Sequence, residues 1–238
     1  MKPVRIAVSA LLLSGAIASL SCRAADAAAP AVPAGPGDAG AQLAPVETAK
    51  GVFRIGDVLI NKAERSITFP AEVNMDKGML EYLLVHRKGK THESLLRTSV
   101  EPYNLKVAFL LLGFEATDQP LAGQGDPATP IGERVRITLN ADTGSRREVI
   151  PVEKWLINRF GGVAREVEPL NWVYSGSIVH QGRFMSQETG QIVAIWHDPI
   201  AMIDNASPGG HSNAIWFVKE GTAPAVGTPV QVIITPAK

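Results

Sequence analysis

The chain has 238 residues, and its 23 lysine and arginine residues balance its 23 aspartate and glutamate residues. This balance gives no electrostatic reason to expect a nucleic-acid partner. Cys22 is the single cysteine, so residues 51–238 cannot hold an iron–sulfur cluster, a cysteine zinc site, a thiol nucleophile or an internal disulfide.

The first 22 residues are typical of a secretory signal. Lys2 and Arg5 supply positive charge at the start, and residues 6–20 follow without a charged side chain. That apolar run is shorter than the span that a membrane helix needs. We therefore expect residues 1–22 to direct export, with the mature protein in the cell envelope.

Cys22 ends the signal in the context ASLSC, where a lipoprotein signal peptidase would cut before a cysteine that receives lipid. Leu20 lies one position later than the usual pattern requires, so ordinary cleavage after Ala18 or Ala27 is the alternative. Residues 23–50 are rich in alanine, proline and glycine, which is typical of a disordered tether. We expect Cys22 to be lipidated at a membrane surface; the alternative is a soluble periplasmic or secreted protein.

The globular part, residues 51–238, is long enough for a single domain with a sizeable core. Residues 52–74 alternate apolar and polar side chains on both sides of residues 62–65, which predicts a β-hairpin. Residues 79–96 carry apolar side chains on both faces before a glycine-containing turn at residues 88–90, which predicts a second, more central hairpin.

One helix is predicted over residues 102–112. Pro102 fits its first turn, and Gly113 fits the left-handed position after its last turn. An apolar stripe at helical spacing consists of Leu105, Ala108, Phe109 and Leu112. Leu110 and its neighbours widen this apolar surface, so we expect sheet to cover the helix on nearly all sides.

Residues 115–131 are typical of a loop and are the expected internal seam or mobile segment. Short strands are expected beyond it, in the segments RVRITLN, REVIPV, NWVYSGSIVH, QIVAIW, NAIWFV and PVQVIIT. Together these elements predict a β-rich α+β domain of mostly antiparallel strands, a partly closed barrel or sandwich packed on one buried helix.

The segment LEYLLVHRKGKTHESLLRTSVEPYNLKVAFLLLGFEA resembles the central signature of the bacterial YdjY-like domain family. The segments WVYSGS, GQIVAIWHDPIAMID, SNAIWFV and GTPVQVIITP resemble its later blocks in the same order, so the resemblance runs from about residue 51 to the C-terminus. The family implies a domain of unestablished function that is frequent in exported proteins, and it supplies no catalytic residue. The ferredoxin-type label of some members does not fit this chain, which lacks the cysteines that a cluster needs.

The turn in HRKGKTHESLLRT contains the candidate binding residues His92, Glu93 and Ser94. In a hairpin with a two-residue turn, His86 and His92 face opposite sides, whereas a three-residue turn pairs them on one face. Neither register puts His92 and Glu93 on the same face, so we expect no three-ligand metal site from this turn alone. The structural alternative is a set of hydrogen-bonded polar residues, with Glu93 partly buried and held by a backbone or basic donor.

Asp142 begins DTGS, the local pattern of an aspartic-protease half-site, but Arg146 and Arg147 follow at once and favour a hairpin turn. His197 and Asp198 are neighbours in the sequence. Neighbouring side chains on a strand point to opposite faces, so these two do not form a dyad by themselves. The sequence indicates no catalytic residue, no set of metal ligands and no cofactor.

Two functions follow from these patterns. We favour a non-enzymatic envelope protein whose tethered domain binds an envelope protein or a small ligand. The alternative is a hydrolase or metal-dependent enzyme that uses His92, Glu93 and Ser94 with His180 or His197. The enzyme requires a concave pocket in which at least two of these side chains converge within hydrogen-bonding distance.

Overall fold

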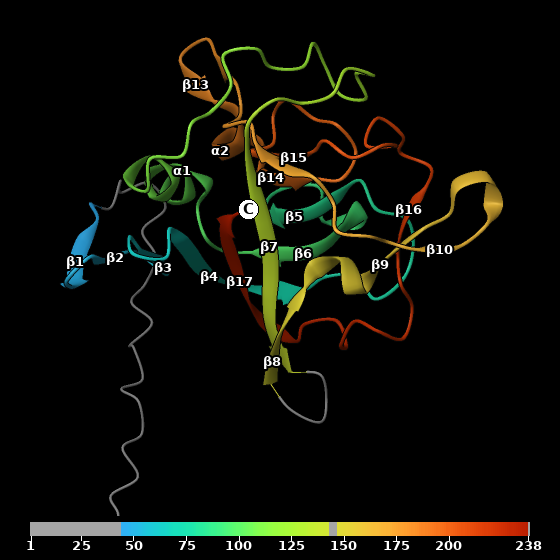
Figure 1. The fold of residues 1–238 in the computed structure, drawn as a ribbon, viewed down its shortest axis with the longest axis horizontal. Helices are drawn as coiled ribbons and strands as arrows, with labels where there is room; N and C mark the ends of the chain where they lie inside the picture. The colour runs from blue at the N-terminus through green and yellow to red at the C-terminus, as the bar shows by residue number, and fades with distance from the viewer. Residues whose placement is uncertain (1–43, 143–146, 238) are drawn as a thin grey trace, which may run out of the picture. The chain divides into compact units, whose positions relative to one another are not determined.

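The structure is a computed structural model that describes residues 44–142 and 147–237. Its strands are β1 (Val46–Ala49), β2 (Val52–Ile55), β3 (Val58–Asn61), β4 (Ser66–Val73), β5 (Tyr82–His86), β6 (Ser94–Thr98), β7 (Glu133–Asp142), β8 (Arg147–Pro151), β9 (Leu156–Asn158), β10 (Arg165–Glu166), β11 (Trp172–Tyr174), β12 (Val179–His180), β13 (Arg183–Phe184), β14 (Gln191–Ala194), β15 (Ile203–Asn205), β16 (Trp216–Val218) and β17 (Pro229–Pro236). The helices are α1 (Pro102–Leu111) and α2 (Met185–Thr189), and the short 3₁₀ helices are η1 (Thr91–Glu93), η2 (Val152–Trp155) and η3 (Phe160–Gly162). The described residues belong to one compact unit, and the loop 115–131 lies within it (Figure 1).

Eight strands form a closed mixed barrel, in the order β4, β17, β7, β11, β15, β14, β5 and β6. The barrel closes where β6 pairs with the second half of β4, at Glu72 with Arg97 and at Val73 with Leu96. Most neighbouring strands are antiparallel. The expected β-rich α+β class is confirmed, and of the expected barrel and sandwich the chain forms a barrel.

Alternate side chains of the long strands fill the barrel. Side chains on a strand alternate between its two faces, so every second residue points inward. On β4, β7 and β17 these inward positions are almost completely buried, as shown by Ile67, Phe69, Ile137, Leu139, Val232 and Ile234. The apolar alternation in the sequence therefore marks the inner face of the barrel.

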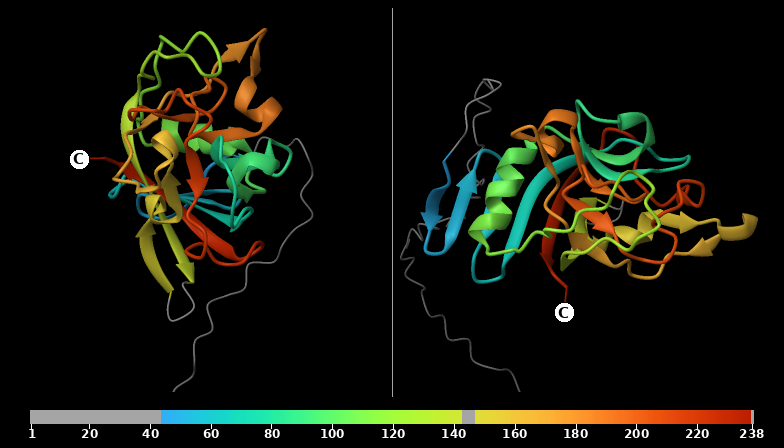
Figure 2. Two further views of the ribbon diagram at one scale, coloured as in Figure 1. Left: turned by 90° about the vertical axis from the view of Figure 1, so that its right-hand side faces the viewer. Right: turned by 90° about the horizontal axis from the view of Figure 1, so that it is seen from above.

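Strands β1, β2 and β3 extend the sheet beyond the barrel at β4 (Figures 1 and 2). The first predicted hairpin is present as β3–β4, where Asn61 Oδ1 accepts hydrogen bonds from the N–H groups of Ala63 and Glu64. A further hairpin, β2–β3, turns through Gly56 at a positive φ of 55°. Strand β1 is exposed along its length at the edge of this extension, so ordered chain begins inside the range expected for the tether.

The second predicted hairpin is wrong, because β5 and β6 lie side by side in the same direction. Tyr82 pairs with Ser94, so residues 87–93 carry the chain back along the length of β5. Parallel neighbours usually need a connection of about a dozen residues or more, and this rule made the short turn favour a hairpin. The return is compact: η1 shortens it, and Gly89 packs so closely on Gly190 that a Cβ would lie 3.1 Å from the Gly190 carbonyl oxygen.

Strands β14 and β15 repeat this arrangement. They are parallel, with Val193 paired to Ile203, and residues 195–202 join them. The two parallel units meet where β14 pairs antiparallel with β5, so the strand order β15–β14–β5–β6 is symmetric about that pair. Ala201 of the connection packs with Tyr82 of β5 in a small cluster outside the main core. The connection therefore runs back over the outer face of the barrel.

Helix α1 confirms the predicted helix, with Pro102 at its start and Gly113 in the left-handed conformation after its end, at φ 69°. It begins soon after β6, contacts β3, β4 and α2, and buries Leu105, Ala108 and Phe109. The expected cover on nearly all sides is wrong, because the Leu110 side chain on the opposite face is 62% exposed. The helix therefore packs one face beside β3 and β4 and leaves the face that carries Leu110 in solvent (Figure 2).

The strands predicted beyond the loop are present, and β7 and β8 form an antiparallel hairpin that pairs Asp142 with Arg147. The rest of the DTGS pattern, residues 143–145, lies outside the described residues.

Within the ranges that the structure describes, no helix combines the length and the apolar character needed to cross a membrane.

Phe109→Ala should lower the free energy of unfolding by about 3 to 5 kcal/mol. The ring is fully buried and stacks on Tyr174 at a centroid distance of 4.0 Å, so its loss opens a cavity. Leu110→Ala, on the exposed face of the same helix, is the control and should change stability by less than about 0.5 kcal/mol. Urea unfolding followed by circular dichroism measures both, and a loss below about 1 kcal/mol for Phe109→Ala would show that α1 lies outside the core.

Candidate functional site

The structure does not bring His92, Glu93 and Ser94 together as one site. The His92 side chain is 78% exposed on η1, whereas Ser94 is fully buried and donates its hydroxyl hydrogen to a carbonyl of its own strand at 2.8 Å. His180 is exposed on β12, and His197 lies in the connection between β14 and β15. The two pockets described below are lined by other residues. Among the described residues, neither of these pockets therefore brings two of the five side chains together, as the enzyme alternative requires.

Glu93 belongs instead to a small ionic cluster. Lys90 Nζ lies 3.3 Å from a carboxylate oxygen of Glu93 and 3.5 Å from one of Glu81. Burial raises the pKa of Glu81, and the neighbouring Glu93 raises it further. Glu93 is thus partly buried and paired with a basic side chain, as expected.

Glu93→Gln should lower the pKa of Glu81, because it removes the negative charge that disfavours ionisation of that neighbour. Carboxyl resonances followed by NMR through a pH titration measure the change. His180→Gln is the control and should leave the Glu81 titration unchanged, because His180 is exposed on β12, away from this cluster. An unchanged Glu81 titration in Glu93→Gln would contradict the coupling of the two carboxyl groups.

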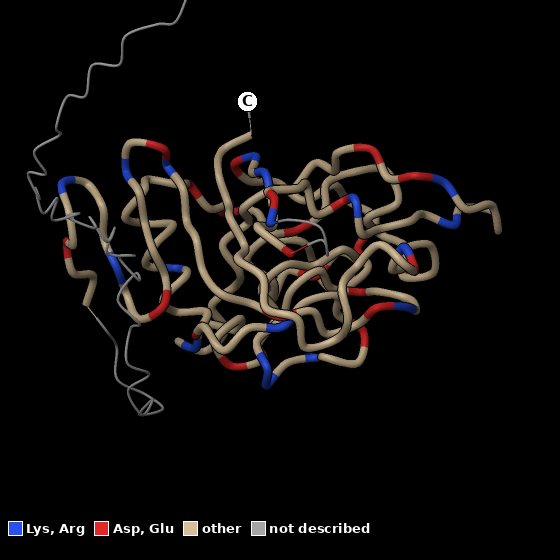
Figure 3. Tube along the Cα trace, turned by 90° about the horizontal axis from the view of Figure 1, so that it is seen from below, with Lys and Arg blue, Asp and Glu red and all other residues tan. Residues whose placement is uncertain are grey.

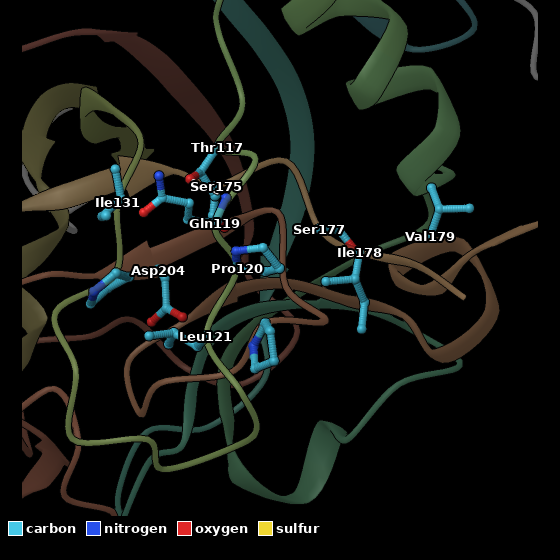
Figure 4. Close-up of a pocket in the computed structure, with 12 residues that line it drawn as sticks. Thr117, Gln119, Pro120, Leu121, Ile131, Ser175, Ser177, Ile178, Val179 and Asp204 are labelled. Atoms are coloured by element: carbon cyan, nitrogen blue, oxygen red, sulfur yellow. Dashed lines mark hydrogen bonds between the residues drawn. The ribbon is translucent and has the colours of Figure 1, made fainter. Parts of the chain in front are cut away.

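A pocket of about 300 Å³ opens on the outer face of the barrel beside β11 and β15 (Figure 4). The loop 115–131 forms one wall, residues 175–179 after β11 form another, and Pro199 comes from the connection between β14 and β15. Most of the lining is apolar, and the polar lining side chains are Thr117, Gln119, Ser175, Ser177 and Asp204. This mixture is typical of a small-molecule site.

Asp204 points away from the barrel interior, because its strand neighbour Ile203 points into the core. Its carboxylate accepts hydrogen bonds from the N–H groups of Asn205 at 2.8 Å and Asp198 at 2.9 Å. The side chain is almost fully buried, and burial raises its pKa to about 6, although the two N–H donors and His197 oppose this rise. A carboxyl group that ionises close to neutral pH therefore lies in the pocket wall.

Asp198 joins this wall to β5. Its carboxylate accepts hydrogen bonds from the Tyr82 hydroxyl at 2.7 Å and from the N–H of Ile200 at 3.0 Å. Gln124 in the loop 115–131 donates from Nε2 to the same Tyr82 oxygen at 2.8 Å. Burial, followed by the nearby Asp198, raises the pKa of Tyr82, so the phenol keeps its proton and remains a donor.

His197 holds the same loop through a second set of contacts. Its Nδ1 lies 2.7 Å from the carbonyl oxygen of Asp126, and its Nε2 lies 2.9 Å from that of Asn205. Carbonyl oxygens only accept, so a ring nitrogen that carries a proton can donate to the carbonyl that faces it. Gly125 also donates its N–H to the His197 carbonyl at 2.8 Å. A buried histidine therefore ties the pocket wall to the barrel.

Sequence reasoning missed this network. His197 and Asp198 are adjacent but lie in an irregular connection rather than on a strand, and each has its own partners. The available signal was WHDPIAMIDN, where polar residues interrupt an apolar segment, since buried polar side chains require hydrogen-bond partners. Gly210 of SPGGHSN also belongs to the site, because a Cβ there would lie 2.4 Å from His197 Nε2.

A second pocket, of about 310 Å³, lies beside β10 and β16. Its charged lining side chains, Arg165, Glu166 and Glu168, are exposed, so it lacks the buried polar group of the first pocket. Across residues 44–142 and 147–237, no three or more histidine, cysteine, aspartate and glutamate side chains are grouped so that they could hold a metal ion.

The fold and the site define a closed mixed β-barrel domain with a ligand-sized pocket beside the loop 115–131. The family model of the YdjY domain matches residues 58–235. The chain therefore belongs to the YdjY domain family, as the resemblance of its sequence blocks indicated. Neither the curated proteins nor the solved structures compared with the chain include a match.

His197→Ala should loosen the loop 115–131, because it removes the ring contacts to the half-buried carbonyl of Asp126 and to the buried carbonyl of Asn205. We expect a loss of stability of about 1 to 3 kcal/mol. Amide hydrogen exchange at Gly125 and Asp126 should become about tenfold faster or more. His180→Ala is the control, since His180 is exposed. Unchanged exchange at both amides would show that the ring does not hold the loop.

Proposed function

We propose that this protein is an exported envelope protein, anchored through a lipid on Cys22, whose barrel domain binds a small ligand without transforming it. The observation that carries the binding role is the pocket of about 300 Å³ with the buried carboxyl group of Asp204 in its wall. Ligand sites are generally concave and mostly apolar, with a few placed polar groups, and span roughly 300 to 1,000 Å³. The pocket meets the lower end of that range, which favours a small molecule over a peptide.

The hydroxyl groups of the pocket support binding rather than catalysis. A serine nucleophile needs a base within hydrogen-bonding distance. Ser177 Oγ instead donates to the carbonyl of Ile200 at 2.5 Å, and Ser175 Oγ lies 3.3 Å from that of Met202. The lining residues include no histidine, lysine or cysteine that would activate either hydroxyl.

A fragment screen by NMR tests the binding role on the mature protein. Ligands should shift the backbone amides of Ile131, Ser175 and Val179 in the first pocket. The amide resonances of Glu168 and Trp216 in the second pocket are the internal reference and should not shift. A screen in which no fragment shifts the first pocket would contradict the proposed function.

Cys22→Ala should move the protein from the membrane fraction to the soluble fraction and abolish labelling with fatty acid. The lone Cys22 directly before the alanine-, proline- and glycine-rich residues 23–50 supports this proposal. Each buried methylene of an acyl chain contributes ~0.8 kcal/mol to membrane partitioning. Ser21→Ala keeps a small residue before the cysteine and should leave labelling intact. Unlabelled parent protein whose mature N-terminus lies beyond residue 22 would contradict the anchor.

A further inference from the structure

The lining of the first pocket carries charge of one sign. Asp204 is the only charged residue among the described residues that line it, and no lysine, arginine or histidine joins the lining. Acidic and basic residues are interspersed along the rest of the described chain (Figure 3). The charge that a ligand meets in the pocket therefore comes from Asp204 and not from a surface field.

The pocket hydroxyls add acceptors to that carboxyl group. Ser175 and Ser177 direct their hydroxyl hydrogens at backbone carbonyls, so they present lone pairs to a ligand. Ser177 Oγ already accepts one hydrogen bond, from the N–H of Ser186 at 3.2 Å. On the side of the pocket that these two serines form, a ligand that donates hydrogen bonds is therefore favoured over one that accepts them.

Two carboxyl groups lie close together under the pocket wall. Asp198 and His197 are the buried titratable neighbours of Asp204, with Tyr82 hydrogen-bonded to Asp198 and the half-buried Asp126 near His197. His197 is the one basic side chain among these neighbours. Burying charge is unfavourable, so a cation in the pocket would stabilise the ionised form of Asp204.

We propose that the pocket selects small cationic amines with an apolar body, and that the ammonium group lies against Asp204. The apolar body covers Ile131 and Val179, which are 56% and 59% exposed at the pocket and would otherwise remain in water. This inference rests on the proposed function, because it names the ligand class of the same pocket.

Three probes of one shape test the charge preference: phenethylamine, 2-phenylethanol and 3-phenylpropionate. Each is titrated into the mature protein by calorimetry, with NMR to place the binding. Phenethylamine should bind about tenfold or more tightly than the alcohol, and the carboxylate should bind more weakly than either. Asp204→Asn should remove the preference for the amine. Glu168→Gln, the same change in the second pocket, should leave it intact.

The affinity for phenethylamine should also depend on pH. Burial raises the pKa of Asp204 to about 6, so the carboxyl group is mostly neutral at pH 5 and mostly ionised at pH 7. Affinity should therefore rise about tenfold between these values, while the probe stays protonated. In Asp204→Asn the affinity should not change with pH. That result would assign the pH dependence to Asp204 rather than to the neighbouring Asp198 or His197.

A second pair of variants keeps the inference testable if Asp204→Asn fails to fold. Ile131 is exposed at the pocket, so a charged side chain there leaves the core intact. Ile131→Glu should strengthen phenethylamine binding, and Ile131→Lys should weaken it, each by about threefold to tenfold.

Each outcome separates the inference from the proposed function. Equal affinity for the amine and the alcohol, or a preference for the carboxylate, would overturn the amine preference while leaving the pocket as a binding site. Effects of the same sign in Ile131→Glu and Ile131→Lys would overturn it as well. If none of the three probes binds and the fragment screen also finds nothing in the pocket, both the inference and the proposed function fail.

Discussion

The barrel depends on parallel strands that are joined by very short connections. Parallel neighbours usually need about a dozen residues or more between them, yet residues 195–202 join β14 to β15. So short a segment cannot leave the barrel surface, and most of it is buried. Its polar side chains must then be paired inside the protein, because an unpaired buried polar group costs about 1 to 3 kcal/mol. The contacts of His197 and Asp198 follow from this constraint.

The partners of these two side chains come from distant parts of the chain. Residues 195–202 therefore also hold other segments of the chain in place. Asp198 accepts a hydrogen bond from Tyr82 of β5, and His197 lies against the carbonyl of Asp126 in the loop 115–131. The loop contains no helix or strand, so these contacts, rather than secondary structure, hold it beside the barrel. The pocket with Asp204 in its wall lies between this loop and β15. The binding role that we propose thus depends on the same hydrogen bonds that pair the buried polar side chains of residues 195–202.

The sequence predicted the elements whose signals are local. Alternation of apolar residues marked the long strands, and Pro102 and Gly113 marked the ends of α1. The direction of β6 could not be predicted, because the same apolar run suits a hairpin or a parallel neighbour, and the short turn at residues 88–90 favoured the hairpin. The site could not be predicted either, because Asp198 meets a partner 116 residues away, and adjacency in the sequence said nothing of that contact.

The parallel pairing is tested most directly by backbone NOEs between strands in the isotope-labelled mature protein. The account predicts contacts between Leu84 and Leu96 and between Val193 and Ile203, because these residues face one another across the two parallel pairs. Contacts of Val85 with His92 or with Glu93, without those of Leu84 and Leu96, would indicate an antiparallel hairpin with a two-residue or a three-residue turn, respectively. That result would contradict the closed barrel and the pocket built on it.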